Sequence, residues 1–315
     1  MMLKIYKTDE TVMKFQELQR DSFENGIWIH MINPTEDEIS TVANAMKTPI
    51  DFIRSALDEE ERAHIDTEDD VTLISIDIPV ESSDKHTGLY ATMPLGIIIG
   101  DKYIITVCLC ENPILNDFIN GRVKAFFTYK KTRFLFQLLH RNSTYFLQYL
   151  RNIDKLSNKI ERELHRSMKN KELIQLLSLE KSLVYFSTSL TSNEAILERL
   201  LRVKPIRLYP EDEELLEDVI IENKQAIEMA NIYSNILTGT MDAFASIISN
   251  NLNIVMKFLA SITIVLSIPT MIASFYGMNV DLPLMNNHYA FIIIFAISFA
   301  ISGLLGFVMF KKNLF

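Results

Sequence analysis

The segment SIPTMIASFYGMNVDLP, residues 267–283, begins as an apolar helix and ends as a polar loop that contains proline. The tripeptide Gly-Met-Asn, residues 277–279, lies at this change and offers no charge, no nucleophile and no base. An ordinary helix end needs only a Gly or Asn cap. The sequence on both sides of the tripeptide therefore has to show what it does.

Two uncharged stretches flank the tripeptide. Residues 258–275 contain 18 residues without a charge, and residues 289–310 contain 22. Both lengths match the roughly 17–25 apolar residues that cross a hydrocarbon core, so we expect two transmembrane helices. The segment 277–288 has no Lys or Arg, whereas Lys311 and Lys312 follow the second stretch. The positive-inside rule then predicts an external loop at 277–288, with both termini, including a basic tail at 311–315, on the cytoplasmic side of the cell's inner (plasma) membrane.

The remaining chain divides into three predicted parts. Residues 1–111 read as an α+β cytoplasmic domain, with strands at 26–31 and 71–80, a helix at 33–46 and a hairpin at 96–109. Residues 112–210 contain helical periodicity at 130–168 and 172–203, which predicts an antiparallel helical hairpin. Residues 211–276 predict one stalk helix that continues into the first span. At 1.5 Å per residue it is roughly 95–100 Å long, too long for one globular domain.

The charges exclude several classes of function. Residues 1–110 contain 21 acidic and 9 basic side chains, a balance of −12. Residues 111–315 contain 19 acidic and 22 basic side chains, a balance of +3, so the whole chain has a net charge of −9. The acidic domain carries either an ordinary solvated surface or one that attracts cations. We expect no nucleic-acid partner, because binding nucleic acid needs a basic surface. A phosphate-binding loop and a paired acid–base constellation are both missing from the sequence, so we expect neither ATP nor enzymatic activity.

Small or polar residues follow one face of the first span in steps of three and four. They are Asn253, Met256, Ala260, Thr263, Ser267, Thr270, Ser274 and Gly277, all small or polar except Met256. One interpretation is close packing between helices, which small and hydroxylated residues allow. The other is a water-filled lumen formed by several copies of this helix, since two spans cannot enclose a pore. The sequence leaves both open.

The second span has a packing signal of its own. Ser298, Ser302 and Gly306 recur every four residues, a pattern that is typical of helix contacts in membranes. In the first span, Pro269 removes one intrahelical hydrogen bond and frees the carbonyl of Val265, which a kink or a water molecule could satisfy.

The motif YGMNV at 276–280 follows a span containing IPTMIAS and precedes a second span and a basic tail. With the long helix and acidic domain before it, this arrangement resembles the CorA family of magnesium transporters. The resemblance implies a funnel-shaped homopentamer in membrane lipid, whose long helices line a central pore. It implies an outer selectivity ring of Gly277, Met278 and Asn279, where Gly277 would permit a sharp turn. It also implies an inner ring of Asn253 and a narrow apolar part at Met256 and Leu259.

The function that the resemblance implies is passive uptake of Mg²⁺, with Co²⁺ and Ni²⁺ as further candidate ions and no organic cofactor. The chain departs from many relatives at Val280, where an aromatic residue is common, and at Ser267, where a bulky one is common. A zinc transporter of the same superfamily and a membrane-anchored helical scaffold without transport are the alternatives.

The family also implies regulation by cytoplasmic Mg²⁺, which carboxylates of neighbouring subunits share in the closed state. Counting back from Asn253, Asp218 matches an acidic sensing position on the long helix, and Asp84 is the candidate partner. Asp218 could instead serve the helix dipole and Asp84 a turn.

Overall fold

The computed structural model describes residues 2–9, 14–19, 22–82, 89–167, 170–206, 209–280, 283 and 288–312. The chain forms two compact units, Met1–Gly239 and Thr240–Phe315. Helix α6 (Pro210–Tyr276) contributes residues to both. Each unit is described by itself below.

A seven-stranded mixed sheet is the centre of the first unit. Its order is β2-β1-β3-β7-β6-β5-β4, and only β3 and β7 pair in parallel among neighbours in the sheet. The strands are β1 (Met2–Thr8), β2 (Phe15–Leu18), β3 (Ile27–Ile32), β4 (His64–Glu68), β5 (Val71–Glu81), β6 (Tyr90–Ile99) and β7 (Tyr103–Cys108). β3 and β7 are buried along their whole length, as expected for central strands with both faces covered.

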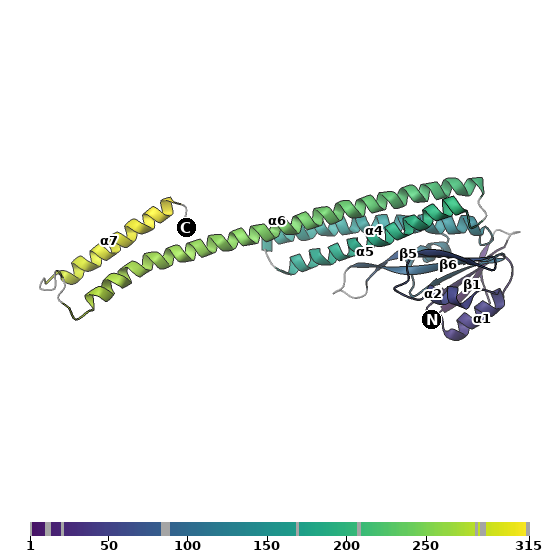
Figure 1. Ribbon diagram of the computed structural model, residues 1–315, viewed down its shortest axis with the longest axis horizontal. Helices are drawn as coiled ribbons and strands as arrows, with labels where there is room; N and C mark the ends of the chain where they lie inside the picture. Colours follow the sequence, from purple (N-terminus) through teal and green to yellow (C-terminus); the bar gives the residue numbers. More distant parts are fainter. Residues whose placement is uncertain are drawn as a thin grey trace. The chain divides into compact units, whose positions relative to one another are not determined.

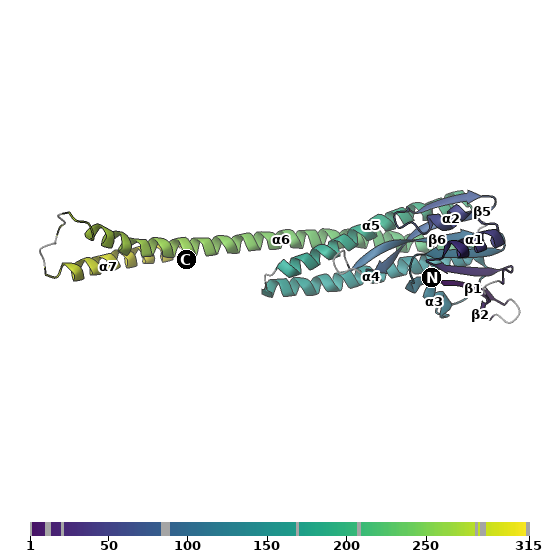
Figure 2. The same ribbon diagram turned by 90° about the horizontal axis from the view of Figure 1, so that it is seen from below.

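Helices cover both faces of the sheet. Helices α1 (Glu36–Met46) and α2 (Ile50–Ser55) pack on one face, where Ile29 and Ile105 enter the core. The other face, which Trp28 and Ile104 enter, holds α3 (Pro113–Ile119), α4 (Lys131–Ser167), α5 (Asn170–Val203) and the start of α6. Figures 1 and 2 show α4 and α5 running beside the first part of α6, and Figure 1 shows α1 and α2 on the opposite side of the sheet.

Two asparagines attach the helices to the sheet. Pairing of β5 with β4 ends at Ser75, so the backbone of Asp77 lies beyond it. Asn142 of α4 and Asn193 of α5 donate to the Asp77 carbonyl at 2.9 and 2.8 Å, and the Asn193 side chain accepts from the Asp77 N–H at 2.9 Å. These bonds satisfy partly buried backbone groups that β4 does not reach, and they attach both helices to β5.

The second unit consists of the rest of α6 and helix α7 (Ala290–Lys311). Both helices are long and apolar enough to cross a membrane. Ser298 and Ser302 are the buried residues of α7, which confirms that the face with small residues every four positions is a packing face.

The structure confirms the predicted strands and all four long helices within a few residues of their predicted ends. It also confirms the hairpin, although its first strand, β6, begins at Tyr90, six residues before the predicted start. Sequence periodicity did not predict β1, β2, β4, α2 or α3. All five are seven residues or shorter, and β4 (HIDTE) has a single buried residue, so none of them gives a clear period.

Candidate functional site

The polar stripe of α6 is not covered by α7. All eight stripe residues, Asn253, Met256, Ala260, Thr263, Ser267, Thr270, Ser274 and Gly277, are exposed in the single chain. Helix α7 lies instead against the side that carries Ser261, which is 2% exposed, and Val265. Val265 follows Thr263 by two residues, about 200° around a helix of 3.6 residues per turn. Packing against the second span therefore does not explain the stripe from Asn253 to Ser267, whereas Thr270 and Gly277 at its outer end line a cavity beside α7.

Three hydroxyl groups of the stripe donate to their own helix. Thr263 donates to the Leu259 carbonyl at 2.8 Å, Ser267 to Ile264 at 2.8 Å and Thr270 to Leu266 at 3.2 Å. A hydroxyl that donates inward keeps its lone pairs as acceptors on the outer side. The stripe thus presents acceptor oxygens without presenting a charge.

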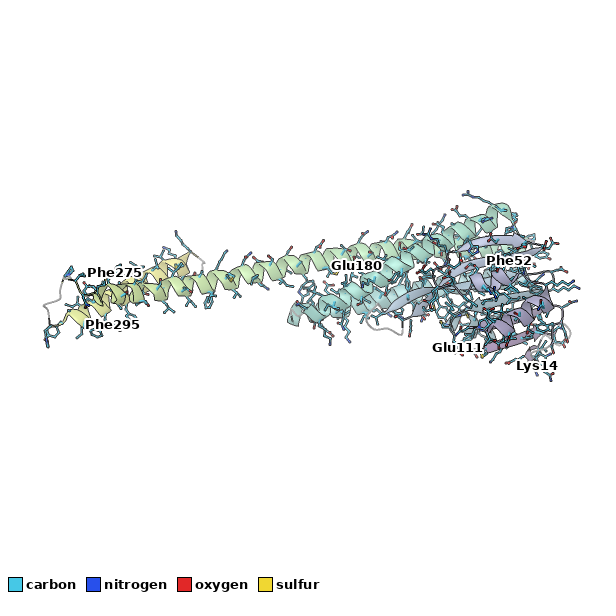
Figure 3. The ribbon with its side chains drawn as sticks, turned by 60° about the horizontal axis from the view of Figure 1, so that its bottom comes forward. Lys14, Phe52, Glu111, Glu180, Phe275 and Phe295 are labelled. Atoms are coloured by element: carbon cyan, nitrogen blue, oxygen red, sulfur yellow. The ribbon has the colours of Figure 1, made fainter. Side chains whose placement is uncertain are left out.

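The outer end of α6 closes with ordinary helical bonds. The Gly277 N–H donates to the carbonyls of Ala273 and Ser274 at 3.0 and 3.2 Å, and the Met278 N–H to Phe275 at 3.3 Å. Gly277 has no left-handed φ, and a Cβ there would only reach ordinary contact, 3.5 Å from the two carbonyl oxygens. The chain does turn at Gly277 and bends over the next three residues, but neither the backbone φ nor the surrounding space requires glycine there. Figure 3 marks Phe275 and Phe295 near this end of α6 and α7.

Met278 and Asn279 follow as exposed residues without regular structure. Just before them, the Tyr276 hydroxyl donates to the Pro283 carbonyl at 3.3 Å, which ties the end of α6 to the loop. Gly277, Met278 and Asn279 therefore lie next to one another at the end of the polar stripe.

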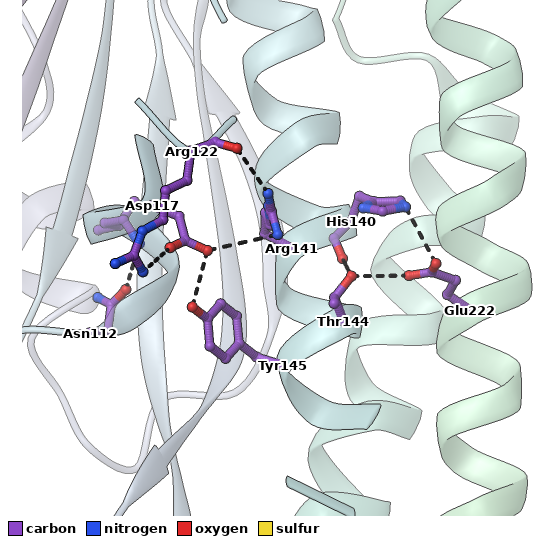
Figure 4. Close-up of polar contacts among 9 residues, drawn as sticks. Asn112, Asp117, Arg122, His140, Arg141, Thr144, Tyr145 and Glu222 are labelled. Carbon is purple, nitrogen blue, oxygen red and sulfur yellow. Dashed lines mark hydrogen bonds and ion pairs between the residues drawn. The ribbon is translucent and has the colours of Figure 1, made fainter. Parts of the chain in front are cut away.

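Asp218 is exposed on α6, one helical turn before Glu222. His140 Nε2 of α4 lies 3.3 Å from Glu222 Oε1, and Thr144 Oγ1 donates to Glu222 Oε2 at 3.4 Å (Figure 4). The hydrogen bond to Glu222 raises the pKa of His140, and the charge of Asp218 adds to this. Asp84 lies outside the described residues. Within the described residues, no three His, Cys, Asp or Glu side chains gather to hold a metal ion.

A second polar cluster, also in Figure 4, attaches α3 to α4. The buried Asp117 accepts from Tyr145 Oη at 3.0 Å and from Arg122 Nη1 at 3.1 Å, and Arg141 Nη1 lies at 3.8 Å. Burial raises the pKa of Tyr145, and its bond to Asp117 raises it further. Sequence reasoning missed this cluster, because α3 is too short to show a period.

The family model of the CorA-like Mg²⁺ transporter protein matches residues 23–312. The chain belongs to this family. Its sequence is 28% identical over 293 residues to the cobalt/magnesium transport protein CorA of Methanocaldococcus jannaschii, and the match covers 89% of each chain. CorA-like proteins are transporters, which is the class that the two apolar helices fit.

Solved structures show the same fold. The complete CorA structure from M. jannaschii has a TM-score of 0.85 at 24% identity, covering 100% of this chain and 99% of that one. The full-length CmaX protein has a TM-score of 0.73 at 13% identity, covering 100% and 98%. The cytoplasmic domain of ZntB from Vibrio parahaemolyticus has a TM-score of 0.59 at 10% identity, covering 79% and 96%. At these identities, the likeness concerns the fold alone.

Proposed function

We propose that this CorA-like chain forms a homopentamer in the inner (plasma) membrane and takes up Mg²⁺ passively through a pore lined by α6. The observation that carries the proposal is the uncovered stripe of acceptor oxygens that ends at Gly-Met-Asn. Five copies would turn this stripe inward. Residues 1–239 and the C-terminal tail would then lie in the cytoplasm, in keeping with the two basic residues at the end of α7.

The chemistry of the stripe suits a hydrated dication. Mg²⁺ releases its waters reluctantly and demands near-ideal octahedral geometry. The waters of the hydrated ion point hydrogens outward, and the hydroxyl oxygens of Thr263, Ser267 and Thr270 can accept them. At the mouth, the Asn279 amide and the Gly277 carbonyl would do the same. A neutral ring holds the ion weakly enough to release it, whereas a carboxylate ring would slow release.

The driving force is the membrane potential, with no organic cofactor. A dication gains about 4–5 kcal/mol per 100 mV of inside-negative potential, twice the figure for one charge. Met256 and Leu259 are each 56% exposed in the single chain. In the pentamer they would form an apolar constriction below the hydroxyl groups, which can close by losing its water. Asn253 lies on the cytoplasmic side of it, where a polar ring would receive the ion.

Ion identity has two candidates. The relative from M. jannaschii is named for cobalt and magnesium, and Met278 within the tripeptide favours magnesium, with Co²⁺ and Ni²⁺ as further ions. A zinc transporter of the same superfamily is the second candidate, because the sequence does not exclude Zn²⁺. Fluxes of Zn²⁺ and Mg²⁺ measured in competition in one preparation distinguish the two.

The test is Mg²⁺ uptake by the purified protein in proteoliposomes with an inside-negative potential. Wild-type protein should take up Mg²⁺, and Asn279→Ala should abolish uptake while the intact mass of the oligomer still corresponds to five copies. Uptake that is unchanged in Asn279→Ala would refute the role of the tripeptide. A chain that assembles but carries no ion would support the helical scaffold instead.

A further inference from the structure

Helix α6 lacks one backbone donor in the middle of its apolar part. In a regular helix, the N–H of residue 269 would bond the carbonyl of Val265. Residue 269 is proline, which has no N–H and crowds that carbonyl. In hydrocarbon no water replaces the missing donor, so the Val265 carbonyl needs a partner from the protein.

Ser302 of α7 is that partner. Its hydroxyl donates to the Val265 carbonyl at 2.6 Å, and the residue is only 6% exposed. Thr263 and Thr270 of α6 donate to carbonyls of their own helix, whereas Ser302 reaches across to its neighbour. Gly306, one turn further along α7, also faces Val265, because a Cβ built there would lie in ordinary contact, 3.8 Å from Val265 Cγ2.

Beyond Pro269 the two helices are less closely packed. A cavity of about 580 Å³ lies between them, lined by Thr270 and Ala273 of α6 and by Phe291 and Phe295 of α7. The last two turns of α6, which lead to Gly277, also line it. The hydrogen bond from Ser302 thus joins the two helices next to the cavity.

We propose that Ser302 is a positioning residue for ion transport. By holding the Val265 carbonyl, it sets the direction in which α6 continues after Pro269, and so the position of Gly277, Met278 and Asn279 around the pore axis. This inference rests on the proposed function. Ser302 touches no ion; it acts through the backbone of α6.

The chain contains a matched control for this role. Ser298 lies one turn before Ser302 on the same face of α7 and is 4% exposed, yet its buried hydroxyl has no hydrogen-bond partner among the residues that the structure describes. Ser298→Ala and Ser302→Ala remove the same atom from equally buried positions. Only Ser302→Ala leaves the Val265 carbonyl unpaired.

Pro269→Ala provides the second control, because alanine restores an N–H that can bond the Val265 carbonyl. Ser302→Ala should therefore have an effect only when Pro269 is present. A double-mutant cycle of Ser302→Ala and Pro269→Ala measures this dependence directly. A role of Ser302 in packing alone would give the same loss in both backgrounds.

The experiment is Mg²⁺ uptake by the full-length protein in proteoliposomes over a range of Mg²⁺ concentrations. Ser302→Ala should raise the half-saturating concentration about 3- to 15-fold, the range that interhelical hydrogen bonds in membranes span, with a smaller change in maximal rate. Ser298→Ala should match the wild type. In the Pro269→Ala background, Ser302→Ala should change the half-saturating concentration less than about twofold.

Equal effects of Ser298→Ala and Ser302→Ala, or an equal effect of Ser302→Ala in both backgrounds, would overturn the inference. If the wild type carries no Mg²⁺, the proposed function fails, and with it the role in transport. The wild type, the two single variants and the double variant of the cycle can then still be compared by their melting midpoints in detergent. These midpoints report whether the Ser302 hydroxyl replaces the backbone donor that Pro269 removes.

Discussion

Asn251 and Asn253 have the same side chain and lie two residues apart on α6, both exposed. At 3.6 residues per turn they lie about 200° apart around the helix, so only Asn253 belongs to the polar stripe. We expect Asn253→Ala to reduce Mg²⁺ uptake about tenfold, which corresponds to a loss of roughly 1.4 kcal/mol of favourable interaction between the ion and the Asn253 ring. Asn251→Ala should stay within twofold of the wild type. Equal uptake by the two variants in proteoliposomes would place the pore on another face.

His30 is a buried residue whose charge state links stability to pH. It is 2% exposed on β3, with Nδ1 3.0 Å from Thr106 Oγ1 of β7. Burial lowers its pKa from 6.5 to about 4. The folded state therefore binds the proton less tightly than the unfolded state does. The contribution of His30 is complete above pH 6.5 and decreases as pH falls toward 4.

Between pH 7 and pH 5 this group should reduce the free energy of unfolding by about 2 kcal/mol. His30→Gln, which cannot be protonated, should remove that part of the acid sensitivity, measured as melting midpoints of the solubilised full chain at the two pH values. The exposed His165 on α4 is the control, and His165→Gln should keep the wild-type difference. An unchanged pH difference in His30→Gln would contradict the assignment.

At the scale of elements, the long helices were predictable because their patterns extend over many turns. The apolar run of α7 and the polar stripe of α6 could be identified from the sequence. The sequence also showed that Pro269 leaves the Val265 carbonyl without its helical donor. The partner of that carbonyl could not be predicted. Residues 277–289 separate the two helices, and no period in the sequence shows which residue of α7 lies opposite Val265. The register between two helices is a tertiary property, and here it places Ser302 within hydrogen-bond distance of the Val265 carbonyl.

The cluster around Asp117 gives a prediction at this scale, since it joins α3 to α4. Asp117→Ala removes the acceptor for Tyr145 and Arg122 and leaves the part-buried Tyr145 hydroxyl without it. We expect a loss of about 1–3 kcal/mol in the free energy of unfolding. Glu163, which forms an exposed pair with Lys159 at 4.0 Å, is the control, and Glu163→Ala should cost at most about 0.5 kcal/mol. Similar losses for the two variants in denaturant titrations would argue against a structural role of Asp117.

At the scale of the whole molecule, the single chain leaves apolar surface that membrane lipid does not explain. Ile221, Ile232 and Ile236 of α6 are 64%, 54% and 58% exposed in the first unit, which carries the acidic α+β fold. Large apolar side chains that recur along one exposed helix favour contact with another protein surface. In the proposed pentamer, α6 helices of neighbouring copies supply that surface, and they also bring Asp218 of each copy to a subunit boundary.

The last prediction concerns this boundary. An open pore at the resting potential would load the cell with dications, so a cytoplasmic Mg²⁺ site that favours the closed state is physically useful. Asp218 of one copy and Asp84 of the next are the proposed ligands. Without the ion their carboxylates repel each other. Bound Mg²⁺ can favour the closed state only through its higher affinity for it, about 1–3 kcal/mol per coupled site, which five sites would multiply.

We therefore expect millimolar-range Mg²⁺ to protect the cytoplasmic domain of the solubilised protein from protease, and Asp218→Ala with Asp84→Ala to lose most of this protection. Glu217→Ala, which removes an exposed charge next to Asp218, is the control and should keep it. Glu217 and Asp218 carry the same charge on neighbouring positions of α6, and dissolved salt screens both charges alike. Protection that depends on Asp218 but not on Glu217 therefore indicates a bound ion rather than a general effect of negative charge. Full Mg²⁺-dependent protection in the double variant would show that this pair is not the sensor. In that case, the charge of Asp218 serves the His140–Glu222 contact between α4 and α6, where it already raises the pKa of His140.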